Sequence, residues 1–350
     1  MKAEAASGAG GRLVDAEAIS GAAAGGEVRL ERVCVIGAGT IGSLLAAHLS
    51  RRCQVWVLTR RPEHARALER DGLRVSGKSE FVARPRATSD AAELPPFDLG
   101  IIAAKATDLE RVGARLAGLS PDATMMTIQN GLGAEEAIAR HGSWPLISSV
   151  TFMSGTRHSD THVEYELDTA TWLGPWAPRP PAMAVVEAVA ALIAAAGLRA
   201  QAFADLLPAQ WSKLIFNSAI NSVSALTELP HVALFADEQA LGPVVRALID
   251  EGRAVAAASG IELYEDPWEM NLLAVARGET NRSDYAHLPS MLEDVLARRP
   301  TEVDFIAGAV VREAARLGVR VPVTAALHRL IKGREASWQL RRGSRTEVMA

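Results

Sequence analysis

Three glycines with the spacing GxGxxG directly follow a short apolar segment, residues 33–36. In a strand, turn and helix unit of this kind, the first glycine permits the turn, the second lets a pyrophosphate approach the backbone, and the third lets the helix pack closely. The helix N-terminus then faces the negative charge. The pattern predicts a dinucleotide-binding loop, and a glycine-rich turn without a ligand is the alternative. The loop consists of Gly37, Ala38, Gly39, Thr40, Ile41 and Gly42.

A basic pair follows the second apolar segment, residues 54–58, where an NAD-specific fold would carry an acidic residue. The chain has Thr59, Arg60 and Arg61 at this point. A carboxylate would repel a 2′-phosphate, whereas a guanidinium binds it through charge-assisted hydrogen bonds. We therefore expect NADPH as the cofactor. The alternative is that the arginines form a solvated pair before a helix that opens at Pro62.

A sparse polar row interrupts an otherwise apolar segment at Lys213, Asn217 and Asn221. With 3.6 residues per helical turn, positions four apart drift by only about 80° over the row, so the three side chains share one face. A solvated helix would normally carry more charge than one cation and two amides. We expect this face to line a cleft, although an ordinary outer face of a helix has the same spacing.

Two further polar residues each follow an apolar segment that is typical of a buried strand. Lys105 follows residues 101–104, and Asn130 comes shortly after residues 123–128. Ligands of open α/β sheets bind outside the carboxyl ends of the strands, so both side chains are expected near a cleft. The alternatives are a solvated lysine and an ordinary Asn-Gly turn.

A second polar cluster lies towards the C-terminus, in residues 287–294 and 300–304. Thr301 and Asp304 match a capping box, and Glu302 suits the first turn of a helix, which predicts a helix over residues 301–317. His287 is either a ligand-binding residue or an ordinary surface or packed histidine.

Composition limits what these residues can bind. The chain has 350 residues, a formal net charge of −4 and 22% charged residues, which favours two globular domains without a basic surface for nucleic acid. Its two cysteines have no CxxC spacing, and no histidine cluster has the spacing of a metal site. We expect a small-molecule partner, no metal, no membrane span and a cytoplasmic location. A homodimer is compatible with these features.

The expected elements give an α/β chain with an N-terminal Rossmann-type doubly wound sheet and an all-helical C-terminal domain. Alternating short apolar runs and helical segments end near residue 203, and long helical patterns at 208–228 and 243–259 follow. Residues 84–97 are expected to form a polar loop. The predicted divisions are a disordered leader (1–28), an NADP-binding domain (29–203), a helical substrate domain (204–336) and a C-terminal tail (337–350).

Seven short motifs, in order along both domains, resemble the ketopantoate reductase family over about residues 31–336. They are GAGTIG at 37–42, LTR ending at Arg60, AAK ending at Lys105, QNG containing Asn130, WSKLIFNSAIN with Lys213, Asn217 and Asn221, PSMLED with Ser290, and RPTEVDFIAG with Glu302. Ser222, where the family often has proline, and His287, where some members have asparagine, depart from the pattern.

The resemblance implies NADPH-dependent reduction of 2-dehydropantoate, a 2-oxo acid, to (R)-pantoate in pantothenate and coenzyme A biosynthesis. It makes Lys213 the general acid, Arg60 and Lys105 contacts of the cofactor's 2′-phosphate end, and Asn130 a neighbour of nicotinamide and substrate. Lys213 is expected to be protonated at neutral pH without tuning, since the reference pKa of lysine is about 10.4. The alternatives are reduction of another 2-oxo acid or an imine, and a non-catalytic NADP(H) sensor. The substrate-binding residues implied are Asn130, Asn217, Asn221, Ser290 and Glu302.

Overall fold

The structure, a computed structural model, describes residues 28–230, 241–280 and 288–347. Its N-terminal part is built on an eight-stranded sheet with the order β12-β11-β8-β7-β6-β1-β2-β5. The six strands from β8 to β5 in this order are parallel to their neighbours, whereas β11 runs antiparallel to β8. The strands are β1 (Arg32–Ile36), β2 (Gln54–Leu58), β5 (Arg86–Thr88), β6 (Leu99–Ile102), β7 (Thr124–Thr127), β8 (Leu146–Thr151), β11 (Thr171–Pro175) and β12 (Ala200–Ala202).

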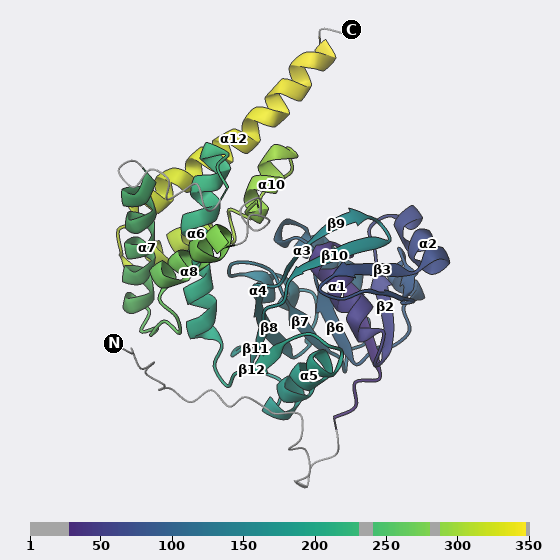
Figure 1. Cartoon of the computed structure of the whole chain (residues 1–350). Helices are drawn as coiled ribbons and strands as arrows, with labels where there is room; N and C mark the ends of the chain where they lie inside the picture. Colours follow the sequence, from purple (N-terminus) through teal and green to yellow (C-terminus); the bar gives the residue numbers. More distant parts are fainter. Residues whose placement is uncertain (1–27, 231–240, 281–287, 348–350) are drawn as a thin grey trace.

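Helices cover both faces of this sheet, because successive side chains of each central strand point to opposite sides. Val33 and Val35 of β1 pack with residues of α1 and α5, whereas Cys34 and Ile36 pack with residues of α3 and α4. The doubly wound arrangement predicted from the sequence is therefore confirmed (Figure 1). The helices are α1 (Thr40–Leu49), α2 (Pro62–Asp71), α3 (Leu109–Leu116), α4 (Ala134–Ala139) and α5 (Met183–Ala195), with short 3-10 turns η1 (Ala91–Glu93) and η2 (Ala106–Asp108).

Two features of this domain differ from the sequence prediction. The segment expected to be a polar loop contains β5, which is too short at three residues to show an alternating pattern and which pairs with β2. A separate four-stranded sheet with the order β4-β3-β10-β9 packs against α1. Its strands are β3 (Leu73–Gly77), β4 (Phe81–Ala83), β9 (Ser154–Ser159) and β10 (His162–Leu167).

The C-terminal part is helical, as predicted. Helix α6 carries the polar row, and most of its residues are buried because α7, α10, α11 and α12 surround it. Gly260 and Gly318 follow the ends of α7 and α11 and take the left-handed conformation, with φ of 71° and 72°, which is typical of glycine after a helix. The helices are α6 (Leu207–Thr227), α7 (Leu241–Ala258), α8 (Pro267–Thr280), α10 (Ser290–Leu296), α11 (Ala307–Leu317) and α12 (Pro322–Glu347).

The start of α11 corrects a sequence prediction. The helix begins at Ala307, not at Thr301, and residues 301–306 form irregular turns. Thr301 does not cap this helix, whose N-cap is Ile306; instead, the hydroxyl and the backbone N–H of Thr301 both donate to Glu335 of α12, each at 2.7 Å. These turns bring Glu302 towards the first domain.

The last helix extends beyond the predicted helical domain. Helix α12 continues to Glu347, so residues 337–347 of the predicted tail are helical (Figure 1). Residues 1–27 of the predicted leader, and His287, lie outside the described residues. In the part of the chain that the structure describes, no helix combines the length and the apolar composition needed to cross a bilayer.

Candidate active site

The glycine loop has the geometry that its motif requires. Gly37 has a φ of 104°, and a Cβ there would lie 2.7 Å from the backbone nitrogen of Ala104. A Cβ on Gly42 would lie 2.0 Å from the carbonyl oxygen of Gly37, so only glycine lets α1 approach this closely. Gly39, at the N-cap of α1, has no heavy atom within 4 Å of a Cβ position. The backbone is thus open where a pyrophosphate would approach the helix N-terminus.

The two arginines after β2 have different environments. Arg61, the N-cap residue of α2, is held by the carboxylate of Asp160 at 2.5 Å and by Glu63 at 3.3 Å. Arg60 is exposed and makes no ion pair or side-chain hydrogen bond with any residue that the structure describes. Its guanidinium is therefore free to bind an external anion, and the residues fit the phosphates of a dinucleotide cofactor.

Lys213 lies in the contact between the two domains. Lys213 is only 8% exposed to solvent, and its Nζ donates a hydrogen bond to the carbonyl oxygen of Thr151 at the end of β8. The Nζ also lies 4.9 Å from the ring centroid of Phe152. Burial lowers the pKa of Lys213 to about 7, although Glu302 acts in the opposite direction. The expectation that this lysine needs no tuning to be protonated is therefore wrong.

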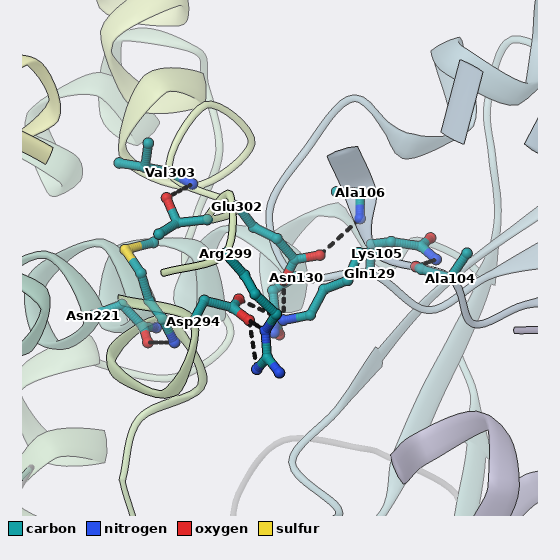
Figure 2. Close-up of polar contacts among 12 residues, drawn as sticks. Ala104, Lys105, Ala106, Gln129, Asn130, Asn221, Asp294, Arg299, Glu302 and Val303 are labelled. Atoms are coloured by element: carbon teal, nitrogen blue, oxygen red, sulfur yellow. Dashed lines mark hydrogen bonds and ion pairs between the residues drawn. The ribbon is translucent and has the colours of Figure 1, made fainter. Parts of the chain in front are cut away.

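The two asparagines of the row both reach partners across the site. The amide nitrogen of Asn217 donates to the amide oxygen of Asn130 at 3.4 Å. The amide oxygen of Asn221 accepts from the backbone N–H of Met291 at 3.4 Å, next to Ser290 at the first position of α10 (Figure 2). The structure thus brings together residues from the first domain, from α6 and from α10.

Gly131 fixes the position of the Asn130 loop against the second domain. Its φ is 94°, and a Cβ there would lie 1.9 Å from the carbonyl oxygen of Phe305. The same carbonyl oxygen accepts a hydrogen bond from the backbone N–H of Leu132 at 2.9 Å. The Asn-Gly pair therefore lies in a bend with positive φ at the glycine, and this bend places Asn130 in the site.

Lys105 and Glu302 form the other side of the site (Figure 2). The carboxylate of Glu302 accepts a hydrogen bond from the backbone N–H of Ala106 at 2.8 Å and lies 4.0 Å from the Lys105 ammonium. Burial raises the pKa of Glu302, and Lys105 acts against this shift. Burial alone would lower the pKa of Lys105, but Glu302 and Asp294 outweigh it and raise that pKa. In this structure Lys105 contacts the helical domain.

Two site residues were missed in the sequence. Asp294 is buried and binds Lys105 at 2.7 Å and Arg299 at 3.0 Å. Gln129 donates to the carbonyl oxygens of Ile102 and Ala104, at 2.7 and 2.9 Å, and so fixes the loop that carries Lys105. The only feature of the sequence that could have indicated them is their closeness along the chain to Ser290 and Asn130. Within the described ranges, no group of three or more His, Cys, Asp or Glu side chains could hold a metal ion.

The space beside Lys213 is small. A cavity of about 10 Å³ lies between α6 and the ends of β7 and β8. A cavity of this volume holds about one water molecule, so a 2-oxo acid requires the domains or their side chains to move apart. A larger hollow, of about 500 Å³, lies against α2 and β5, close to the loop that carries Arg60. Neither Lys213 nor the asparagines of α6 line it. The cavity beside Lys213 is lined by Gln129, Asn130, Gly131, Ser149, Val150, Gln210, Lys213 and Leu214.

The fold and the site together define an NAD(P)-dependent reductase. The chain belongs to the ketopantoate reductase family. Residues 33–178 match the family model "Ketopantoate reductase PanE/ApbA", and residues 205–335 match its C-terminal counterpart. The chain is 31% identical over 309 residues to a 2-dehydropantoate 2-reductase of Archaeoglobus fulgidus, covering 88% of this chain and 99% of the relative.

Solved structures agree with this assignment. A PanE/ApbA family ketopantoate reductase from Ralstonia eutropha JMP134 is 27% identical, with a TM-score of 0.77 over 88% of this chain and 99% of the other. A D-mandelate dehydrogenase bound to NADH and anilino(oxo)acetate has a TM-score of 0.78 at 22% identity, covering 87% of this chain and 99% of the other. At that identity the second likeness concerns the fold alone.

Proposed function

We propose that this enzyme reduces 2-dehydropantoate to (R)-pantoate with NADPH, in the cytoplasmic route to pantothenate and coenzyme A. The observation that carries the proposal is the position of Lys213. A buried ammonium with a lowered pKa lies beside two asparagines and a buried glutamate, at the carboxyl ends of the strands of a dinucleotide-binding sheet. Ligands of such sheets bind at this edge. The combination suits a reaction that gives a proton to a developing alkoxide.

The chain supplies binding, orientation and a proton. The Gly37–Gly42 loop and the free Arg60 would hold the phosphates of NADPH, which supplies the hydride for C2 of the substrate when bound. The ammonium of Lys213 would polarise the C2 carbonyl and transfer its proton to that oxygen. Loss of a general acid typically costs 10²- to 10⁴-fold in rate.

The remaining polar residues would hold the ends of the substrate. Its carboxylate and its terminal hydroxyl require donors and acceptors, which Asn217, Asn221, Ser290 and Glu302 supply. Asn130 would orient Asn217, since their amides are already in contact at 3.4 Å. Lys105 would contribute positive charge to the same cleft.

A direct assay tests this function. Purified enzyme is mixed with NADPH and a panel of 2-oxo acids, and NADPH oxidation is followed. When a site forms hydrogen bonds to a substrate hydroxyl, an analogue without that hydroxyl has a kcat/KM lower by up to about 10⁴-fold. We expect a much higher kcat/KM for 2-dehydropantoate than for 2-oxoisovalerate, which lacks the hydroxymethyl group. Equal or inverted efficiencies would favour a different 2-oxo acid, and no turnover with any 2-oxo acid or imine would favour a non-catalytic NADP(H) sensor.

A further inference from the structure

The end of strand β8 surrounds the ammonium of Lys213 with two different kinds of electron-rich group. The backbone carbonyl of Thr151 accepts a hydrogen bond from Nζ, and the ring of Phe152 lies 4.9 Å from the same atom. A cation within about 6 Å of an aromatic ring centroid is attracted by the quadrupole of the ring, most strongly where water is excluded. Lys213 is buried, so this condition is met.

Both groups are fixed by the sheet and its neighbours. Thr151 is paired with Thr171 of β11, and the hydroxyl of Thr171 donates to that of Thr151 at 3.0 Å. The Phe152 ring makes edge contacts with Trp172 and Phe216, with centroid distances of 5.7 and 6.3 Å. Trp172 belongs to the same domain as Phe152, whereas Phe216 is on α6 with Lys213, so the ring is packed from both sides of the domain contact in this structure.

Apart from burial, Glu302 is the group that shifts the pKa of Lys213. Glu302 acts to raise the pKa of Lys213, and its carboxylate also lies 4.0 Å from the ammonium of Lys105. Asp294 lies behind Lys105, at 2.7 Å. Burial opposes all of these interactions and lowers the pKa of Lys213. Any group that contacts the ammonium directly therefore has a large influence on whether the lysine carries a proton at neutral pH.

We propose that Phe152 is a positioning residue that uses its ring face to keep Lys213 protonated and aimed into the cleft. The proposal rests on the assignment of Lys213 as the proton donor in the proposed function. It gives a defined role to an aromatic residue that the sequence did not single out. A purely structural role for Phe152 would require only its apolar volume, and this difference makes the proposal testable.

The first experiment measures the pKa of Lys213 without substrate. The rate of Lys213 acetylation by acetic anhydride is followed against pH by mass spectrometry. In Phe152→Leu, loss of a desolvated cation–ring contact should lower that pKa by about one pH unit. Phe152→Tyr keeps the ring and should retain the parent value. Phe203→Leu removes another ring of the same aromatic cluster, one that stacks against Trp172 and Tyr264 and not against the ammonium of Lys213, and should also retain the parent value.

A second variant preserves the shape of the site. Replacement of Phe152 by 3,4,5-trifluorophenylalanine weakens the quadrupole of the ring and leaves its volume nearly unchanged. The pKa of Lys213 should fall, and the alkaline limb of the kcat/KM profile should move to lower pH with it. An unchanged pKa in the fluorinated variant, or an equal fall in Phe203→Leu, overturns the proposal. Since acetylation needs no substrate, a wrong substrate assignment would leave this result intact and would appear only in the turnover assay.

Discussion

The ammonium of Lys105 lies 2.7 Å from the carboxylate of Asp294, and this ion pair joins the loop after β6 to helix α10 (Figure 2). The two residues are 189 positions apart in the chain. The same loop donates the Ala106 N–H to Glu302. The helical domain thus binds one short segment of the first domain through two carboxylates. These contacts hold the two halves of the site together and leave only the small cavity beside Lys213.

Breaking this pair should favour the open arrangement of the domains. A charge-assisted hydrogen bond contributes about 1.5–3 kcal/mol, and the lower end applies because the Lys105 side chain is 45% exposed. Substrate enters when the domains are apart, but proton transfer from Lys213 requires them to close on it, so we expect Asp294→Asn to reduce kcat/KM by about tenfold. Asp108→Asn removes a carboxylate from an exposed pair with Arg111 and serves as the matched control. An equal loss in both variants would contradict the link between this pair and closure.

Arg60 should determine the choice of cofactor. The loss of a charged hydrogen bond to a 2′-phosphate weakens binding by about 10- to 100-fold. We expect Arg60→Ala to reduce the preference for NADPH over NADH by this factor, measured as the ratio of kcat/KM values. Arg329→Ala removes the same charge from an exposed position of α12, in the helical domain, and should leave the ratio unchanged. A parent enzyme that uses both cofactors equally would disprove the assignment.

The pH dependence of activity should follow Lys213. A general acid works in its protonated form, and kcat/KM reports the protonation state of the free enzyme. Because the pKa of Lys213 is about 7, kcat/KM should be maximal below this pH and fall about tenfold per unit above it. Lys213→Arg keeps a positive charge, but arginine cannot transfer its proton. Its kcat/KM should therefore be lower than that of the parent by about 100-fold or more at every pH. A profile that is flat from about pH 6 to 9 would exclude Lys213 as the proton donor.

The elements that the sequence predicted well are those with local signals. Buried strands such as β6 are continuous apolar runs, and α7 ends at a glycine with positive φ. The row on α6 was also visible, since helical spacing alone places Lys213 and Asn217 on one face. Its partners, Asn130 and Met291, come from other elements. The strand-end position of Asn130 predicted that it lies near a cleft, but nothing in the sequence predicted which residues the two asparagines would contact.

The features that the sequence did not predict depend on distant residues. The start of α11 could not be located because Thr301 is bound by Glu335, 34 positions away. The ion pair of Lys105 with Asp294 has no local signature, because the two residues are 189 positions apart. The lowered pKa of Lys213 arises from burial between two domains, which spacing does not reveal. These features depend on burial and on pairing between residues far apart in the chain, which local sequence patterns do not show.

A buried histidine should make folding stability depend on pH. His48 is fully buried in α1, where its Nδ1 lies 3.1 Å from the carbonyl oxygen of Ala196, and burial lowers its pKa below 6.5. The unfolded chain therefore binds a proton near pH 6.5, whereas the folded chain does so only at lower pH. The contribution of His48 to the free energy of unfolding is fully present above about pH 6.5 and is lost as the pH falls below this value.

This dependence can be isolated by comparing slopes. His64 has a pKa lowered in the same direction by burial, so the parent slope contains both residues. We expect His48→Leu to reduce the loss of thermal midpoint between about pH 7 and pH 5.5, whatever its effect on stability at pH 7. A parent protein that is equally stable at the two pH values would contradict the prediction.

The two glycines around the start of α1 should respond differently to alanine. In Gly42→Ala, the new Cβ would lie 2.0 Å from the carbonyl oxygen of Gly37, so α1 must shift. Overpacking of this kind costs about 1–3 kcal/mol, and we expect a lower thermal midpoint. In Gly39→Ala, the new Cβ meets no atom within 4 Å, and φ is an ordinary −75°. The fold should be retained.

Gly39→Ala should nevertheless impair cofactor binding, because its methyl group would occupy the space through which a pyrophosphate approaches the backbone. We expect the KM for the cofactor to rise by about tenfold or more, as for the loss of one charged hydrogen bond. Calorimetric titration with the cofactor and a thermal melt on the same sample separate binding from stability. If Gly39→Ala binds the cofactor as well as the parent does, the pyrophosphate does not lie on this loop, whatever the effect of Gly42→Ala on folding.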